Sequence, residues 1–243
     1  MFIPIGDDNS ARKRLPIVTW ALVAMNTYVW FLELSKGERF LASYAAIPYE
    51  ITTGIDLLAT KYLPRGGEYI PIPNGPGPHP IQLTLLTSMF MHGSWMHIIG
   101  NMVYLLIFGD QIEDRLGRVK FLLFYLMAGI AAGLAQVWAT PLSPLPCVGA
   151  SGAIAGVLGA YLILYPGNAI RVLVFRNIIN LPAFLVLGMW GFMQVAGHLG
   201  APGEQGGVAY MAHIGGFIVG LIASVFIKLF SRQGSRRGSN QIW

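Results

Sequence analysis

The sequence predicts an all-α polytopic membrane protein, and two observations carry this prediction. Of the 243 residues, 54% are hydrophobic and only 11% are charged, whereas soluble domains carry about 25% charged residues. Apolar segments also recur along the chain, most of them near the length of about 20 residues that a helix needs to cross a bilayer. A lipid bilayer, and no nucleic acid, is therefore the expected environment.

Six apolar segments are expected to cross the membrane, and they define the domain boundaries. A short tail (1–14) precedes the membrane domain (15–230), and a basic tail (231–243) follows it. A long loop (about 35–93) separates the first two spanning helices, and Ser94 is expected to cap the second of them. The six apolar segments are residues 15–34, 81–109, 119–138, 151–165, 179–197 and 207–230, with the part of the second up to His92 expected along the interface.

Basic residues predict the orientation of the spans. The net charge is +5, and placing both termini in the cytoplasm puts twelve of the sixteen Lys and Arg residues on that side, as the positive-inside rule favours. The long first loop is then external. The N-terminal residues lack the apolar core and cleavage site of a signal peptide, and the short tails favour a bacterial plasma membrane.

The fourth segment is expected to be too short to span the bilayer fully. Its fifteen residues, starting at Ser151, would form a helix about 22 Å long. The hydrocarbon core is about 30 Å thick. We therefore expect Ser151 to lie below the external membrane surface.

Ser151 and His213 form a candidate nucleophile and base. A serine hydroxyl becomes reactive next to a base, and ionisable residues inside spans are costly enough to suggest a function. Each residue lies on a stripe of small residues, which lets membrane helices approach closely. The predicted stripes are Ser151, Ala155 and Gly159 on the fourth segment, and His213, Gly216 and Gly220 on the sixth.

Hydrogen-bond donors for a developing oxyanion are also predicted around Ser151. Its backbone N–H lies at a helix N-terminus, where such groups are unpaired. His97 and Asn101 are four residues apart and share one helix face. No Asp or Glu is expected well inside a span, and neither an HExxH motif nor a pair of intramembrane aspartates occurs. These absences exclude HExxH zinc chemistry and paired-aspartate chemistry, and we therefore expect a Ser–His dyad.

Each of these residues has a simpler interpretation when it is considered alone. Ser151 can be a small residue in a packed helix, His213 a satisfied buried polar group, and Asn101 a hydrogen-bonding link between helices. Gln194 and His198 can line a cavity or mark the membrane interface. The joint occurrence of nucleophile, base and donors favours catalysis, because each group supplies one part of the same mechanism.

Four motifs, in this order, resemble those of rhomboid-type intramembrane serine proteases. Residues Gly149–Gly152 (GASG) are similar to the family's GxSG nucleophile motif. The spacing of histidine, histidine and asparagine in His92–Asn101 resembles its second-helix signature, and Glu113–Gly117 resembles the ExxxG turn that follows. Residues Ala212–Gly220 resemble its sixth-helix histidine with a GxxxG motif. The resemblance covers about residues 15–230.

This resemblance implies a six-helix rhomboid-like bundle that cleaves single-pass membrane proteins within their transmembrane segments, without a cofactor. The roles it implies are Ser151 as nucleophile, His213 as general base, His97, Asn101 and Gly149 in oxyanion and substrate binding, and His92 as a supporting residue.

Two positions depart from the family pattern. Leu83 and Thr84 occupy the place where many members carry a Trp-Arg pair. Ala155 stands where many members carry an aromatic ring that stacks on the catalytic histidine. Another group is therefore needed to hold the ring of His213.

Two other functions are compatible with the sequence. A non-catalytic rhomboid-like protein could bind or escort membrane clients, but the presence of both Ser151 and His213 argues against it. A small transporter or channel is less favoured, because the carboxylate relays and broken paired helices that such proteins often show are missing from the sequence pattern.

Overall fold

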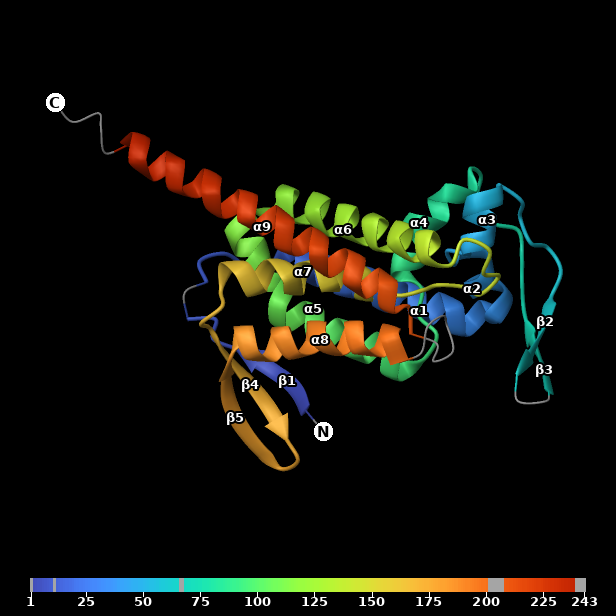
Figure 1. Cartoon of the computed structure of the whole chain (residues 1–243), viewed down its shortest axis with the longest axis horizontal. Helices are drawn as coiled ribbons and strands as arrows, with labels where there is room; N and C mark the ends of the chain where they lie inside the picture. Colours follow the sequence, from blue (N-terminus) through green and yellow to red (C-terminus); the bar gives the residue numbers. More distant parts are fainter. Residues whose placement is uncertain (1, 11, 66–67, 201–207, 239–243) are drawn as a thin grey trace.

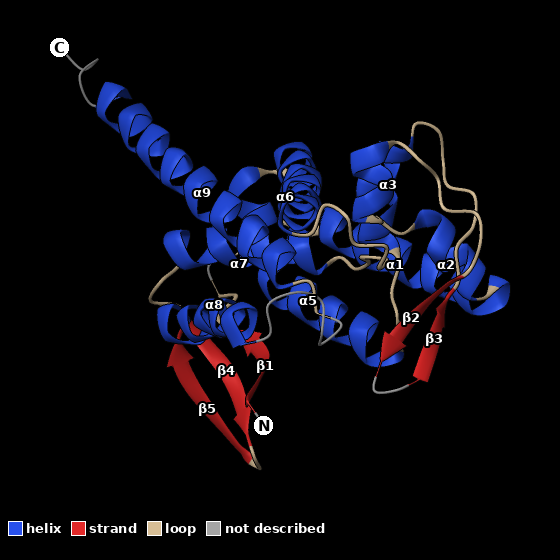
Figure 2. Ribbon diagram, turned by 45° about the vertical axis from the view of Figure 1, so that its right-hand side comes forward, coloured by secondary structure: helices blue, strands red, loops and turns tan. Residues whose placement is uncertain are grey.

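The computed structural model describes residues 2–10, 12–65, 68–200 and 208–238. Long helices dominate it, and two small antiparallel sheets lie apart from each other at the edges of the helical bundle (Figure 2). The long helices are α1 (Ile17–Lys36), α5 (Trp95–Leu116), α6 (Arg118–Ala139), α7 (Ser151–Leu164), α8 (Ala183–Gly200) and α9 (Tyr210–Gly238).

Four of these helices identify an integral membrane protein. By length and composition, α1, α6, α8 and the Tyr210–Leu229 part of α9 can cross a membrane. Helix α7 is apolar but has only 14 residues, so the prediction of a short fourth helix is confirmed. Helix α5 begins at Trp95, where the Ser94 hydroxyl accepts the N–H of His97 at 3.2 Å. The predicted N-cap is therefore confirmed as well.

Helix α7 lies at the centre of the bundle and packs against α5, α6, α8 and α9 (Figure 1). Its backbone lies so close to that of α9 that there is no room for side chains at the contact. A Cβ atom on Gly216 would overlap the carbonyl of Gly152, and one on Gly220 would overlap the carbonyl of Gly156. Gly159 of the predicted stripe also meets α9, because a Cβ atom there would overlap the carbonyl of Phe217, and the contact face extends to Gly152 and Gly156, which the sequence did not predict.

The N-terminal residues form part of a sheet. Strand β1 (Phe2–Asp7) pairs with β4 (Ala169–Val174), which pairs with β5 (Asn177–Pro182). The predicted fifth span is found as α8, but its predicted start at residue 179 is wrong, because residues up to Pro182 complete a hairpin and the helix begins at Ala183. At the other terminus, α9 continues through residues 231–238 of the predicted tail, and 239–243 lie outside the described residues.

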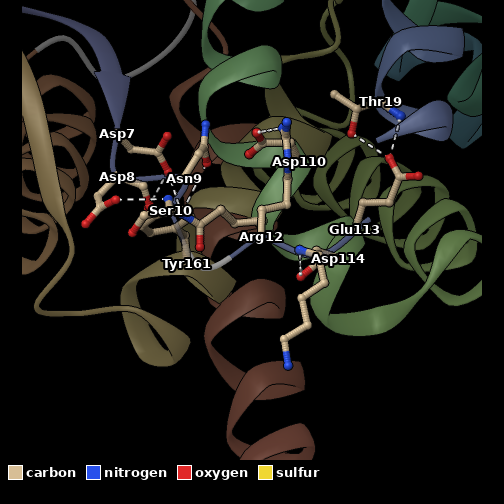
Figure 3. Close-up of polar contacts among 12 residues, drawn as sticks. Asp7, Asp8, Asn9, Ser10, Arg12, Thr19, Asp110, Glu113, Asp114 and Tyr161 are labelled. Carbon is tan, nitrogen blue, oxygen red and sulfur yellow. Dashed lines mark hydrogen bonds and ion pairs between the residues drawn. The ribbon is translucent and has the colours of Figure 1, made fainter. Parts of the chain in front are cut away.

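Polar side chains fasten the N-terminal segment to α5 and α7 (Figure 3). The Asp7 carboxylate accepts a hydrogen bond of 2.6 Å from the hydroxyl of Tyr161 on α7. Arg12 forms an ion pair with Asp110 on α5, with Nη1 and Oδ2 2.6 Å apart. Both carboxylates are buried, and such groups are stable inside a protein only when they are paired.

Glu113 explains why the motif Glu113–Gly117 lies where it does. Its carboxylate accepts the backbone N–H groups of Val18 and Thr19 at 3.0 and 2.8 Å, and Figure 3 shows the contact with Thr19. These groups belong to the first turn of α1, where N–H donors lack helical partners. Gly117, with φ of +78°, ends α5 and allows α6 to start at once. One glutamate thus caps α1 from the end of α5.

The long first loop is folded against the opposite end of the bundle from the three-stranded sheet (Figure 1). Its backbone binds the loop that leads into α7: Ala46 and Cys147 exchange hydrogen bonds of 3.0 and 2.9 Å, and the N–H of Tyr49 donates to the carbonyl of Ser143 at 3.0 Å. The loop contains α2 (Glu38–Tyr44), α3 (Pro48–Thr53), β2 (Lys61–Arg65), β3 (Glu68–Ile72) and the short turns η1 (Ile81–Leu83), α4 (Thr84–Thr87) and η2 (Ser88–Phe90).

Glu50 makes the stability of this loop depend on pH. Burial raises the pKa of its carboxyl to about 7, although the N–H of Leu57 donates to it at 2.7 Å. Because the folded pKa exceeds the unfolded one, the folded loop binds the proton more tightly, and its stability falls as pH rises from about 4.5 to 7. We expect hydrogen exchange of residues 48–58, corrected for intrinsic rates, to show weaker protection at pH 8 than at pH 5. Glu50→Gln should remove that difference, and an equal difference in the variant would contradict this assignment.

Candidate active site

Ser151 and His213 are brought together by α7 and α9. Ser151 is the first residue of α7, and His213 lies in the first turn of α9. Nε2 of His213 lies 2.8 Å from Oγ of Ser151. This is hydrogen-bonding distance between a hydroxyl and an imidazole nitrogen, the arrangement that a nucleophile and its base require.

The backbone before Ser151 is shaped by Gly149. Its φ of +122° is one that residues with a side chain rarely adopt, and its N–H donates to the carbonyl of Ser88 at 2.9 Å. A Cβ atom at this position would lie 2.7 Å from Nε2 of His97 and 3.5 Å from Oγ of Ser151. Glycine therefore keeps open the space between the serine and the histidine of α5.

His97 and Asn101 line the same cavity as Ser151 and His213. Asn101 is only 7% exposed, yet its amide Nδ2 has no hydrogen-bond partner within the described part of the chain. A buried donor without a partner is uncommon and calls for an explanation. A substrate carbonyl oxygen in the cavity would supply the missing acceptor.

His92 lies behind His97, with the two rings edge to face and their centroids 5.2 Å apart. Its backbone N–H donates to both carboxylate oxygens of Glu33, at 3.0 and 3.2 Å. Glu33 lies in the last turn of α1 and is buried. The sequence did not single out this carboxylate, because it lies at the end of the predicted span 15–34 and not well inside it. It acts on the backbone of His92 rather than on Ser151 or His213.

Gln194 and Trp190 of α8 contact the ring of His213, and the sequence analysis assigned neither of them a role there. Oε1 of Gln194 lies 2.8 Å from Nδ1 of His213. The Trp190 ring lies 5.8 Å from the His213 ring, centroid to centroid, and is tilted by 41°. Trp190 therefore packs beside His213 and supplies an aromatic ring there. In many family members this ring comes from the position that Ala155 occupies here. Trp190 and Gln194 are four residues apart and therefore share one face of an apolar helix, and this was the signal that the sequence offered.

The cavity that contains these groups has a volume of about 840 Å³. Its wall is mostly apolar, and the first loop contributes Pro71, Ile72 and Pro73 to it. The described residues contain no group of three or more His, Cys, Asp or Glu side chains that could hold a metal ion. The cavity thus combines room for an extended apolar chain with a small set of polar groups.

Comparison with known proteins identifies the class to which this fold and site belong. A family model described as the rhomboid domain matches residues 81–230, which is more than half of the chain. The chain belongs to the rhomboid family.

Individual relatives come from mitochondria and from bacteria. The chain is 28% identical over 90% of its length to Rhomboid protein 1, mitochondrial, of Saccharomyces cerevisiae, of which it covers 56%. It is 37% identical over 54% of its length to Presenilin-associated rhomboid-like protein A, mitochondrial, of Danio rerio, of which it covers 37%. It is 34% identical over 60% of its length to the Rhomboid protease GluP of Bacillus subtilis, of which it covers 26%. The chain thus spans between about a quarter and just over half of these relatives.

Proposed function

We propose that this protein is an intramembrane serine endopeptidase that cleaves transmembrane segments of membrane proteins. The observation that carries the proposal is the 2.8 Å contact between Oγ of Ser151 and Nε2 of His213 within a largely apolar cavity. Membership in the rhomboid family and the match to a bacterial rhomboid protease support it.

The geometry suggests a two-step hydrolysis. Nε2 of His213 takes the proton of Ser151 as Oγ attacks the scissile carbonyl carbon, and the same nitrogen returns the proton to the leaving amine. This forms an acyl-enzyme on Ser151. A water molecule, deprotonated by His213, then attacks the ester, and His213 returns this proton to Oγ of Ser151 as the second product leaves with a carboxyl group. The backbone N–H of Ser151, His97 and Nδ2 of Asn101 stabilise the oxyanion of each tetrahedral intermediate.

We also propose the membrane topology. Helices α5 and α7 cross the membrane together with α1, α6, α8 and α9, so the domain of residues 15–230 has six spans, an external first loop and cytoplasmic termini. The proposed location is a bacterial plasma membrane, which the Bacillus subtilis match supports, whereas the mitochondrial matches favour an organelle membrane. Accessibility of cysteines introduced into each loop, with Cys147 replaced, tests the orientation.

The proposed activity is tested with the purified full chain in liposomes. A panel of single transmembrane segments, each fused between two soluble reporter domains, serves as substrate, and a fluorophosphonate probe reports the nucleophile. We expect at least one segment to be cleaved and the probe to be found on Ser151 by mass spectrometry. Ser151→Ala is the control for both readouts. Undiminished cleavage by that variant would contradict the proposal. Binding of segments without any cleavage by the wild type would favour the alternative, a non-catalytic protein that escorts clients.

Asn101 gives a second test of the mechanism. Asn101→Ala removes the unpartnered donor, and Asn101→Asp keeps the shape but replaces the amide donor by oxygen. Loss of one oxyanion donor typically lowers kcat by about 10² to 10³, so we expect both variants to lose about a hundredfold in kcat with little change in KM. A wild-type kcat in Asn101→Ala would assign this residue to helix packing instead.

A further inference from the structure

The orientation of the Gln194 amide is determined by its two neighbours. Its Nε2 donates to the backbone carbonyl of Trp190 at 3.2 Å, and a carbonyl can only accept. If the amide were rotated, two acceptor oxygens would face each other. Oε1 is therefore the atom that faces Nδ1 of His213 at 2.8 Å.

The amide orientation in turn determines where the proton of the neutral His213 ring lies. Because Oε1 accepts, Nδ1 must carry the hydrogen. The other ring nitrogen, Nε2, then has a free lone pair, and it is the atom that lies 2.8 Å from Oγ of Ser151. Only this tautomer can take the serine proton. Gln194 thus favours the one form of the ring that can act as a base.

Gln194 and Trp190 together also restrict how the ring is placed. The amide holds one edge of the His213 ring, and the Trp190 ring packs against it. Trp190 also packs against Phe217, which lies one turn after His213 on α9, and the two ring centroids are 5.7 Å apart. Gln194 is only 9% exposed, so water competes weakly for its hydrogen bonds.

We infer that Gln194 is a positioning residue that selects the Nδ1-protonated tautomer of His213 and orients its ring toward Ser151, with Trp190 as the ring that packs beside it. The inference rests on the proposed protease function for its kinetic consequences. Gln194 does not touch substrate, and it receives no proton during the reaction. Its role is comparable to that of the third member of a serine protease triad, supplied here by a neutral amide.

Two substitutions of similar size separate positioning from packing. Gln194→Met fills the same space without an acceptor for Nδ1–H. Gln194→Glu, which is neutral when protonated, keeps an acceptor for Nδ1–H and a donor for the Trp190 carbonyl. We expect Gln194→Met to lower kcat and the rate of Ser151 labelling by about ten- to a hundredfold, with KM unchanged, because a wrong tautomer disables the base. Gln194→Glu should recover most of both rates.

Asn26→Leu is the matched control. Asn26 is a fully buried amide of α1 that donates to the carbonyl of Leu22 and is absent from the cavity lining. We expect it to change thermal stability without changing the labelling rate. Rates for Gln194→Met within twofold of the wild type, or no recovery in Gln194→Glu, would overturn the inference.

A spectroscopic readout keeps the inference testable whatever the activity proves to be. Nitrogen-15 NMR of ring-labelled histidine in the wild-type protein, with the His213 signals identified by their loss in His213→Ala, reports the tautomer directly. We expect hydrogen on Nδ1. Hydrogen on Nε2 would overturn the inference, even if Ser151 proves to be the nucleophile. Conversely, hydrogen on Nδ1 in a protein that cleaves nothing would reject the protease function alone.

Discussion

Exchanging His213 for alanine is expected to lower the rate of substrate cleavage by about ten-thousandfold or more. The variant lacks the only base within hydrogen-bonding distance of Oγ of Ser151 in the described part of the chain. Residues that act as one unit are strongly non-additive. The double variant His213→Ala with Ser151→Ala should therefore be no less active than either single variant. Cleavage rates of the three variants, measured on one transmembrane substrate in liposomes, test this directly.

The control for this experiment must show that the helices remain packed. We expect the thermal midpoints of the three variants to stay near that of the wild type. Ser151 and His213 line a cavity, so their truncation leaves the glycine contacts between α7 and α9 unchanged. Multiplicative losses in the double variant would mean that the two residues act independently, which would contradict a shared proton transfer.

Gly220→Ala is expected to have the second-largest effect, although the residue lies far along α9 from Ser151. A Cβ atom there would overlap the carbonyl of Gly156 and lie 3.0 Å from the backbone nitrogen of Ala160. These are backbone atoms, which cannot rotate away as a side chain can. The helices must therefore separate. Overpacking of this kind costs about 1–3 kcal/mol, and a shift of about 1 Å in catalytic groups can cost about a hundredfold in rate.

Gly188→Ala provides the matched control for this substitution. Gly188 is also helical, but a Cβ atom there would have no atom within 4 Å, so alanine should leave activity unchanged and raise stability slightly through its better helix propensity. Thermal unfolding and cleavage rates of the two variants are compared. Wild-type values for Gly220→Ala would show that α7 and α9 tolerate separation at this point.

Local signals in the sequence predicted the helices and some of their ends, although α5 continues to Leu116, beyond the end predicted at residue 109. Ser94 supplies a cap and the proline-glycine pair after Tyr165 stops α7, so both helix ends could be predicted from nearest neighbours alone. The grouping of Ser151 with His213 came from the spacing of small residues. That spacing indicated contact between the correct helices, and Gly159 of the predicted stripe does meet the backbone of α9, but the contacts of Gly152 and Gly156 with α9 were not predicted.

Features that depend on distant partners escaped prediction. Strand β1 pairs with β4, which is far away in the sequence, and β4 pairs with β5. No local pattern in residues 2–7 identifies residues 169–174 as their partner. Gln194 was visible as a polar residue on an apolar helix, but its meaning depends on which nitrogen of His213 it faces. Such relations are set by packing of whole helices, which periodicity alone does not specify.

The pairing of β1 with β4 has a consequence for biosynthesis. Phe2 lies opposite Val174, so β1 has no strand partner until α1, α5, α6 and α7 have all been made. During that time the strand edge of β1 remains uncovered, although Gln111 on α5 can already donate to the Asp7 carboxylate. The ion pair between Arg12 and Asp110 and the capping of α1 by Glu113 can form earlier, and they hold the waiting strand near its final place. Closing the sheet is then a late event that requires the central helix to be in position first.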